Sequence, residues 1–562
     1  MHGLRGHLAR YFGSSAIAVG LALCFVASGC GDDAQAVDGA GPEDGGVTDS
    51  APHDGGVTDG ASDDGRGDVE VAVRGTVTYD SVPATYDAST GRATLAFSLA
   101  TVKPVRNAVV QLRQGPQVLA STTTDEQGDY EFSLTAPASG AIEVAVLAKT
   151  LSPPIQVENN TDGDAVWEAS RPLLDPKGTL DLHATHGWTG TSYDAAKRLA
   201  APFAVLDTLY AATRTVLAVR TVEFPPLAVG WSPENVPQRG DVALGFIDTT
   251  RYSSQTGKMY VLGKDRADTD EFDAHVLVQE WTRFVEHRLS RSDSPGGSSG
   301  TGDVLDPRVS FSDGLARAFA AMVLSDSIYV DTRWDGTSSS WTGFGIDAET
   351  APSRTDDPEP GAFSQATVHR LLFDLYDSGT NEVYDLVDLG LGPVFDVLVG
   401  GHKSTSALTT IASFIAALKS QPGVSAAAVD SLLAHYQIGP ITTAWGDGDA
   451  DLASMYTRLS SLPYSSGITL SGGSPSNVRE QNQYFTFTGT GAAVTVSATS
   501  SDDVAIAMFH DGKVVGSADD VLTGTEQASV ATTQLDATYV VVLTGFRSDS
   551  GNYGVNVAIT SL

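Results

Sequence analysis

Apolar and polar residues alternate along two parts of this 562-residue chain and recur at helical spacing between them. The segments VEVAVRGTVTY (69–79) and DYEFSLTA (129–136) alternate with a period of two, and turn signals such as DEQGD separate them. The same pattern returns in QYFTFTG (483–489) and TYVVVLTGF (538–546). Because the side chains of a strand point alternately to its two faces, both parts are predicted to be antiparallel β-sandwiches.

The residues between these two parts carry a helical pattern. Apolar residues recur at i, i+3 and i+4 in five segments, which predicts amphipathic helices at 195–218, 272–289, 313–326, 364–377 and 407–421. Shorter apolar runs predict three strands, PPLAVGW (225–231), ALGFID (243–248) and KMYVLG (258–263). The middle of the chain is therefore predicted to be an α+β domain that is mostly helical.

A chain of this length is too long for a single hydrophobic core. The predicted fold class is multidomain, with a β-sandwich, then the mostly helical α+β domain, then a C-terminal β-sandwich. The changes in pattern place these domains at residues 69–164, 165–465 and 466–562.

The N-terminal segment carries neither pattern. Two arginines precede the apolar run AIAVGLALCFV and then ASGC, which ends at Cys30. This arrangement resembles a bacterial lipoprotein signal peptide over residues 1–29. The resemblance implies export, lipidation of Cys30, and a membrane anchor at the outer membrane or cell surface. Cys24 is the poorer candidate because a bulky leucine precedes it, and a secretory signal with an incidental cysteine is the alternative.

Residues 30–68 are dominated by Asp, Gly, Ala, Ser, Thr and Pro, and the sequence DGGVTD occurs in them twice. Such a stretch buries too little apolar surface to offset the entropy lost on ordering. It is therefore predicted to be a disordered tether.

Charge and cysteine content exclude some functions. The chain has 34 Lys and Arg against 69 Asp and Glu, a net charge of −35, which argues against nucleic acid as a partner. Its two cysteines, Cys24 and Cys30, both precede the predicted folded part. Neither a disulfide framework nor a cysteine-based metal site is therefore expected there.

Both β parts resemble accessory domains of secreted proteins. The segments RGTVTY, PVRNAVVQLRQG and STTTDEQGDYEFSL resemble the carboxypeptidase-regulatory-like, transthyretin-like domain. The C-terminal segment TYVVVLTGFRSDSGNYGVNVAI resembles the pre-peptidase C-terminal-like sandwich. These resemblances imply folds that space or dock neighbouring domains, and they imply no reaction.

The helical segment HVLVQEWTRFVEHRL and its surroundings resemble a bacterial exported zinc metallopeptidase family. In that family a helix reads H-E-[WY]-G-H and a later helix begins with Glu-Gly. The likeness runs through much of residues 200–380 and includes PFAVLDTLY, PPLAVGWSP and DPRVSFSDGLARAF. Carried over by position, the motif histidines correspond to Gln279 and Arg283, the catalytic glutamate to Glu280, and the third-ligand glutamate to Asp313. The resemblance implies a zincin-like fold.

The substitutions remove the donors that zinc needs. Gln279 offers a weak, neutral amide oxygen, and Arg283 carries a permanent positive charge and no lone pair. Glu280 is retained, Asp313 is a shortened acid, and Thr282 replaces the motif glycine. No zinc or other cofactor is therefore expected. A guanidinium entering the former metal volume predicts an ion pair between Arg283 and Asp313.

Several histidines offer weaker candidates for a metal site. His275 and His287 are separated by more than three helical turns, roughly 18 Å, which is too far to share one ion. Both are expected to be structural residues. His183 and His186 form the short motif HATH and are expected to be loop residues without an acidic partner.

The acidic residues before this helix, Asp268, Asp270, Glu271 and Asp273, have two interpretations. Acids in this position cap the first turn of a helix and interact favourably with its dipole, which is the expectation here. Calcium binding is the alternative.

The sequence supports three functional hypotheses. The first is a cell-envelope lipoprotein with a catalytically inactive metallopeptidase-like domain, which binds or scaffolds peptides, proteins or glycans of the envelope. The second is an active metal-dependent peptidase with a non-standard site. The third is a surface adhesion or carbohydrate-binding protein that acts through its β-sandwiches. Loss of both motif histidines favours the first, so the chain is not expected to be an enzyme.

Overall fold

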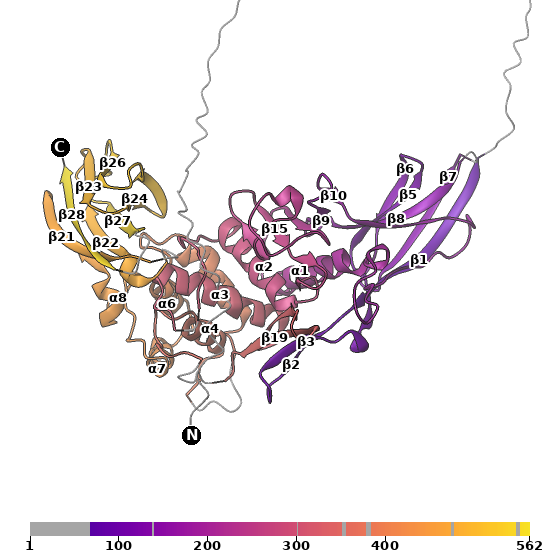
Figure 1. Ribbon diagram of the computed structural model, residues 1–562, viewed down its shortest axis with the longest axis horizontal. Helices are drawn as coiled ribbons and strands as arrows, with labels where there is room; N and C mark the ends of the chain where they lie inside the picture. The colour runs from indigo at the N-terminus through magenta and orange to yellow at the C-terminus, as the bar shows by residue number, and fades with distance from the viewer. Residues whose placement is uncertain are drawn as a thin grey trace, which may run out of the picture.

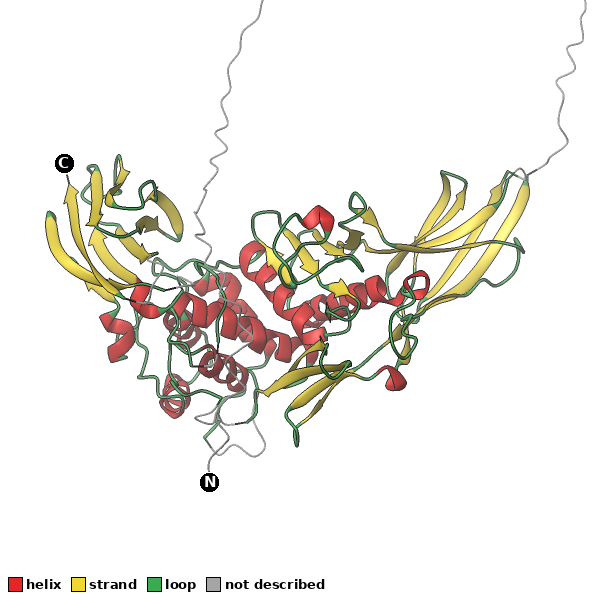
Figure 2. Cartoon of the chain, viewed as in Figure 1, coloured by secondary structure: helices red, strands yellow, loops and turns green. Residues whose placement is uncertain are grey.

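A computed structural model shows an elongated molecule, with strands at both ends and most helices between them (Figures 1 and 2). The structure describes residues 68–137, 140–300, 302–350, 356–377, 384–473, 477–546 and 551–561. The predicted signal peptide, Cys30 and all but the last residue of the predicted tether lie outside the described residues.

Twelve strands precede the first long helix. They are β1 (Val69–Ser81), β2 (Ala84–Asp87), β3 (Arg92–Leu95), β4 (Thr101–Pro104), β5 (Ala108–Gln114), β6 (Gln117–Thr123), β7 (Asp129–Ala136), β8 (Ile142–Thr150), β9 (Ile155–Asn159), β10 (Ala165–Val166), β11 (Glu168–Pro172) and β12 (Leu182–Ala184). Strand β1 pairs with β4, β7 and β12, and the alternation predicted from the sequence is visible in its buried Val71, Val73 and Val77. The β2–β3 hairpin packs against a later hairpin of the middle region.

One sheet continues from these strands into the middle of the chain. Its order is β14–β15–β13–β9–β8–β5–β6, where β13 (Leu227–Trp231) runs parallel to both β9 and β15 (Lys258–Val261), and β14 is Arg251–Ser253. Strands on both sides of the boundary predicted after residue 164 therefore belong to one sheet. A single cluster of buried apolar residues likewise extends from Val71 through the helical region.

The middle region contains the helices. They are α1 (Ala200–Val219), α2 (Ala274–Arg288), α3 (Pro307–Leu324), α4 (Gln365–Asp374), α5 (Leu391–Val397), α6 (Ile411–Lys419), α7 (Ala426–His435) and α8 (Ala450–Ser454). Short strands accompany them: β16 (Gly263–Lys264), β17 (Asp268–Thr269), β18 (Ile328–Asp335) and β19 (Ser340–Asp347). None of the described helices is long and apolar enough to cross a membrane.

One predicted strand of this region is wrong. Residues Val242–Leu244, which overlap the start of the ALGFID segment, form a single 3-10 turn. The Asp241 carboxylate accepts a hydrogen bond from the Ala243 backbone N–H at 2.9 Å, and Gly245 ends the turn with a positive φ of 84°. An Asx-type start and a left-handed glycine favour a turn over an extended segment.

The C-terminal strands form a sandwich with its own core. They are β20 (Tyr456–Arg458), β21 (Tyr464–Ser471), β22 (Asn482–Thr488), β23 (Val494–Ser500), β24 (Val504–His510), β25 (Lys513–Ala518), β26 (Gly524–Val530), β27 (Thr538–Gly545) and β28 (Asn552–Ser561). Two sheets, β20–β22–β27–β24–β25 and β21–β28–β23–β26, enclose a separate cluster of buried residues. The chain is thus a multidomain protein rich in strands, with sandwich-like sheets and a helical middle.

Candidate functional site

Helices α2 and α3 bring together the residues singled out from the sequence. Trp281 of α2 stacks on Phe319 of α3, with ring centroids 6.3 Å apart, and both side chains are buried. The motif residues of α2 lie beside this contact. Gly314 lets α4 approach α3, because a Cβ at this position would lie 2.6 Å from Val368 Cγ1. Glycine after Asp313 is therefore required by packing.

The Arg283 side chain lies between two acids, as the sequence predicts. Its Nη2 donates to Asp313 Oδ1 at 2.7 Å, and its Nε donates to Glu280 Oε1 at 3.3 Å. The exposed fraction of the side chain is 28% for Arg283, 6% for Glu280 and 8% for Asp313. Burial would lower the pKa of Arg283, but the two acids outweigh it and raise the pKa. The arginine is a permanent counter-charge in this site.

The remaining polar atoms of these residues bond to neighbouring loops and strands. Asp313 Oδ2 accepts a hydrogen bond from Ser299 Oγ at 2.9 Å, and Glu280 Oε2 accepts one from the Tyr252 backbone N–H at 2.8 Å. Gln279 Nε2 donates to Glu280 Oε1 at 3.1 Å, while Gln279 Oε1 is buried without a hydrogen-bond partner. Glu280 is thus engaged as an acceptor on both oxygens.

Sequence reasoning missed a third acid, Glu286. It is 3% exposed, and its Oε2 accepts a hydrogen bond from Ser312 Oγ at 2.9 Å. Burial raises the pKa of Glu286 to about 8, although Arg283 and Ser312 oppose that shift. Its spacing of three residues from Arg283 on one helix could have indicated that the charge of Arg283 acts on it. We call Glu280, Arg283, Glu286 and Asp313 the arginine site.

The arginine site does not fit a zinc ion. Zinc sites in proteins use imidazole, thiolate or carboxylate donors arranged around one point. Here the two carboxylates that face that point, Glu280 and Asp313, both bond to the Arg283 guanidinium, which repels a cation. The amide of Gln279 adds one weak donor. No reaction step through a metal follows from this arrangement.

The histidines hold structural positions. His275 is buried, with Nε2 3.1 Å from the Asp326 carbonyl oxygen, and His287 Nδ1 lies 2.8 Å from Tyr252 Oη. His186 lies in a loop as expected. The same expectation is wrong for His183, which lies in β12 with Nε2 3.0 Å from Asp80 Oδ1. Parallel pairing of β12 with β1 brings this acid close to it.

The acids before α2 do not cap it as expected. Asp273 occupies the N-cap position, but its side chain makes no capping hydrogen bond. Instead Asp273 Oδ2 accepts hydrogen bonds from the Thr332 backbone N–H at 2.7 Å and from Thr332 Oγ1 at 2.9 Å. Glu271 forms an ion pair with Arg198. Strand β18, which passes beside this turn, supplies donors that compete with the helix terminus.

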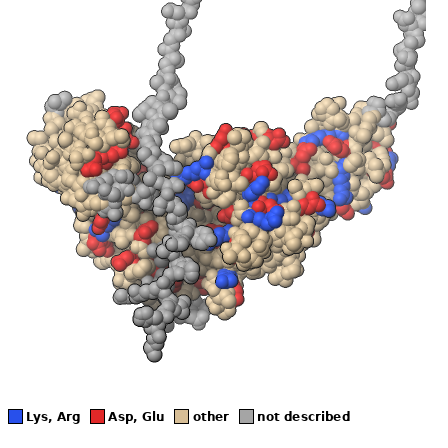
Figure 3. Space-filling model, in the orientation of Figure 1, with Lys and Arg blue, Asp and Glu red and all other residues tan. Residues whose placement is uncertain are grey.

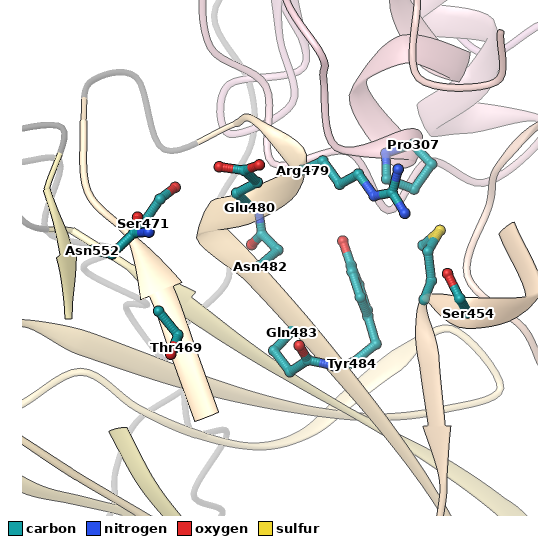
Figure 4. A pocket seen from close by; sticks show the side chains of 11 residues that line it. Pro307, Ser454, Thr469, Ser471, Arg479, Glu480, Asn482, Gln483, Tyr484 and Asn552 are labelled. Atoms are coloured by element: carbon teal, nitrogen blue, oxygen red, sulfur yellow. The ribbon is translucent and has the colours of Figure 1, made fainter. Parts of the chain in front are cut away.

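A polar cavity of about 350 Å³ lies where the C-terminal sandwich meets the helical region (Figure 4). Side chains of β21, β22, β28 and the turn before β22 line it on one side, and Pro307 and Ser454 face them from α3 and α8. Amide and charged groups dominate the wall, including Arg479, Glu480 and Gln483. No residue of the arginine site lines this cavity.

Charges of both signs are interspersed over the N-terminal and middle regions on the face shown in Figure 3. Lys and Arg side chains lie next to Asp and Glu there. Ion pairs between exposed side chains of these regions include Lys177–Glu70 and Arg239–Asp248. Surface pairs of this kind contribute little to stability.

No family model matches this chain, and no curated protein matches it. Among solved structures, the chain is similar to the pre-peptidase C-terminal domain of collagenase from Bacillus anthracis. The identity is 12% over 19% of this chain and 94% of that chain, with a TM-score of 0.15. No activity or binding property of this chain follows from that similarity, and the metallopeptidase resemblance stays a proposal.

Proposed function

We propose that this chain is a cell-envelope lipoprotein whose metallopeptidase-like domain is catalytically inactive and serves in binding or scaffolding. One observation carries the proposal: the Arg283 guanidinium bonds to both Glu280 and Asp313, the two acids that the resemblance assigns to catalysis and metal binding. A permanent cation in that position takes the place that a divalent ion needs.

The geometry supports this proposal at three further points. Glu280 would have to accept a proton from a metal-bound water to act as general base, yet both of its oxygens already accept hydrogen bonds. Asp313, one carbon shorter than the family glutamate, reaches Arg283 directly. Buried Trp281 and Phe319 hold α2 and α3 together without a metal.

A gain-of-metal experiment tests the inactive-peptidase proposal. The triple variant Gln279→His, Arg283→His and Asp313→Glu restores the family donors and is expected to bind one zinc ion per chain. The matched control keeps Arg283 and carries only Gln279→His and Asp313→Glu, and it is expected to bind none. Metal content after dialysis, measured by atomic spectroscopy, distinguishes them.

Two outcomes would overturn the proposal. One is stoichiometric, chelator-removable zinc in the parent chain, together with peptide cleavage that Glu280→Gln abolishes; this would favour the active peptidase. The other is a folded triple variant without zinc, which would remove the metallopeptidase-like interpretation itself.

Anchoring at Cys30 is the second part of the proposal, and it rests on the sequence. Cys30→Ala is expected to move the protein from the membrane pellet to the soluble fraction and to abolish incorporation of labelled fatty acid. Cys24→Ala is the matched control and is expected to leave both unchanged. Unchanged pelleting of Cys30→Ala would contradict a lipid anchor.

The polar cavity favours a second candidate function, recognition of a polar ligand such as a glycan. Its amide and charged groups offer both donors and acceptors, as sugar hydroxyls require. A glycan and peptide binding screen of the parent chain tests this candidate. Gln483→Ala is expected to weaken any ligand bound there, whereas Gln527→Ala, at an exposed position of β26, is expected to leave binding unchanged. Equal binding by both variants would place the ligand elsewhere.

A further inference from the structure

Four carboxylates converge beside the N-terminus of α2. Asp268 lies in β17, Asp270 and Asp273 lie in the turn that leads to α2, and Asp331 lies in β18. One carboxylate oxygen from each of Asp270, Asp273 and Asp331 lies within 4.8 Å of the other two. Asp268 is near enough that its charge raises the pKa of Asp270. We call these four residues the acid cluster.

The acid cluster contains buried oxygens without a partner. Asp270 is 3% exposed, yet its Oδ1 makes no hydrogen bond. The Oδ1 atom of Asp268 is likewise buried without a hydrogen-bond partner. Asp273 differs, because Thr332 donates to both of its oxygens. A buried carboxylate oxygen without a donor loses its hydration and gains nothing in return. The unpartnered oxygen of Asp270, on a carboxylate grouped with those of Asp273 and Asp331, points to a ligand that accepts its lone pair.

The charge of the acid cluster is also uncompensated at close range. Among the described residues, no Lys, Arg or His nitrogen lies within 4.0 Å of a carboxylate oxygen of the cluster. Burial raises the pKa of Asp331 to about 6, and Arg317 and Arg333 oppose that shift from a greater distance. Burial and neighbouring acids raise the pKa of Asp270 and Asp273 well above the ordinary range. The cluster therefore requires a positive partner, either protons or a cation.

We propose that the acid cluster binds one calcium ion, with Asp270, Asp273 and Asp331 as direct ligands and Asp268 completing the shell. Carboxylate oxygens are the donors that hard divalent cations prefer, and oxygens that lie within 4.8 Å of one another can share one calcium ion at bond lengths of about 2.4 Å. Asp268 and Asp331 are only partly buried, which leaves a route for the ion from solvent. Zinc is disfavoured by the absence of nitrogen or sulfur donors in the cluster.

The ion would connect two elements that are distant in sequence. Asp270 and Asp273 precede α2, the helix that carries the arginine site, and Asp331 lies in β18. A calcium ion would thereby fix the start of α2 against β18. This inference does not depend on the proposed function, because it uses no residue of the arginine site.

Thermal unfolding and terbium luminescence of the purified chain test the calcium site. After dialysis against EDTA, calcium at about a hundred-fold excess over its dissociation constant is expected to raise Tm by about 5 °C. Magnesium is expected to raise it less, because it demands a tighter octahedral shell. Terbium is expected to bind once per chain, and calcium is expected to displace it. Tyr329, on the same face of β18 as Asp331, can sensitise its emission.

Variants assign the effect to the acid cluster. Asp270→Asn and Asp331→Asn are expected to abolish both the Tm increase and the terbium signal while the chain remains folded, since each removes a repelling charge. Asp335→Asn is the matched control on β18, where the acid bonds to its own turn through Thr337 and Ser338, and it is expected to retain both responses. An EDTA-treated parent that responds to neither ion, or an Asp270→Asn variant that responds like the parent, would overturn the proposal. In either case protons, not a cation, neutralise these acids.

Discussion

The arginine site and the acid cluster both adjoin helix α2, and they compensate their buried carboxylates in different ways. Both bury several carboxylates near α2. In the arginine site a guanidinium from the same helix bonds to two of them. In the acid cluster the carboxylates face one another, and two oxygens have no donor. A buried charge must be compensated. Arg283 compensates the acids of the arginine site, whereas the acid cluster requires protons or a cation from solvent.

This difference distinguishes the proposed loss of a zinc site from the proposed calcium site. Where a side-chain cation stands among the acids, as Arg283 does, a divalent ion has no place. Where acids gather without such a cation, an ion can bind even though no metal motif is present. The number of acids does not distinguish the two cases, whereas the position of the nearest arginine does.

The largest expected effect comes from removing the fixed cation. Arg283→Met keeps the length and apolar stem of the side chain but leaves Glu280 and Asp313 buried without a counter-charge. Breaking a buried ion pair on one side costs about 3–5 kcal/mol, and the partial exposure of Arg283 places the expected loss near the lower end. Urea unfolding of parent and variant measures it.

The matched control for Arg283→Met is Arg92→Met, at an exposed position of β3, which is expected to change the free energy of unfolding by less than about 1 kcal/mol. Equal losses in the two variants would show that the arginine site is not the buried ion pair described above.

The same chemical change should act in different ways at the two sites. Asp313→Asn removes the charged partner of Arg283 and is expected to lower the free energy of unfolding by about 1.5–3 kcal/mol, the range for hydrogen bonds to charged groups. Asp270→Asn in calcium-free buffer removes a charge that repels the neighbouring acids, so this variant is expected not to lower the free energy of unfolding. Chemical unfolding in EDTA compares them. Equal losses of unfolding free energy in the two variants would mean that the buried carboxylates of both sites are compensated in the same way.

Much of the arginine site could be predicted, because its parts lie close in sequence or follow from one resemblance. Gln279, Glu280 and Arg283 share a helix whose apolar period is clear, and the Glu-Gly position of the family supplied Asp313. The ion pair then followed from charge alone. Glu286 was within reach of the same argument, since it lies on the same helix, but its burial depends on Ser312 and the packing of α3.

The acid cluster and the shared sheet could not be predicted in the same way. Asp331 meets Asp270 only because β18 folds back beside the turn before α2. The pairing of β9 with β13 joins two strands that are distant in sequence, and the pattern of apolar residues does not specify it. Alternation and helical period predict the elements, while tertiary contacts decide which acids meet and which sheet a strand joins.

The last expected effect is a pH dependence of stability that belongs to the arginine site. Burial raises the pKa of Glu286 to about 8, against 4.5 in the unfolded chain, with Arg283 and Asp313 as the charged groups that act on it. Between these values the folded state binds a proton that the unfolded state releases, so this contribution to stability falls as pH rises. The slope is at most about 1.4 kcal/mol per pH unit, and it levels off above pH 8. Glu286→Gln mimics the protonated acid and is expected to lack this slope, so the stability of the parent relative to the variant is expected to fall as pH rises towards 8. Free energies of unfolding of parent and variant at pH 5.5, 6.5, 7.5 and 8.5 test this. Parallel curves of stability against pH would mean that Glu286 is already ionised beside Arg283. The guanidinium would then compensate three carboxylates instead of two.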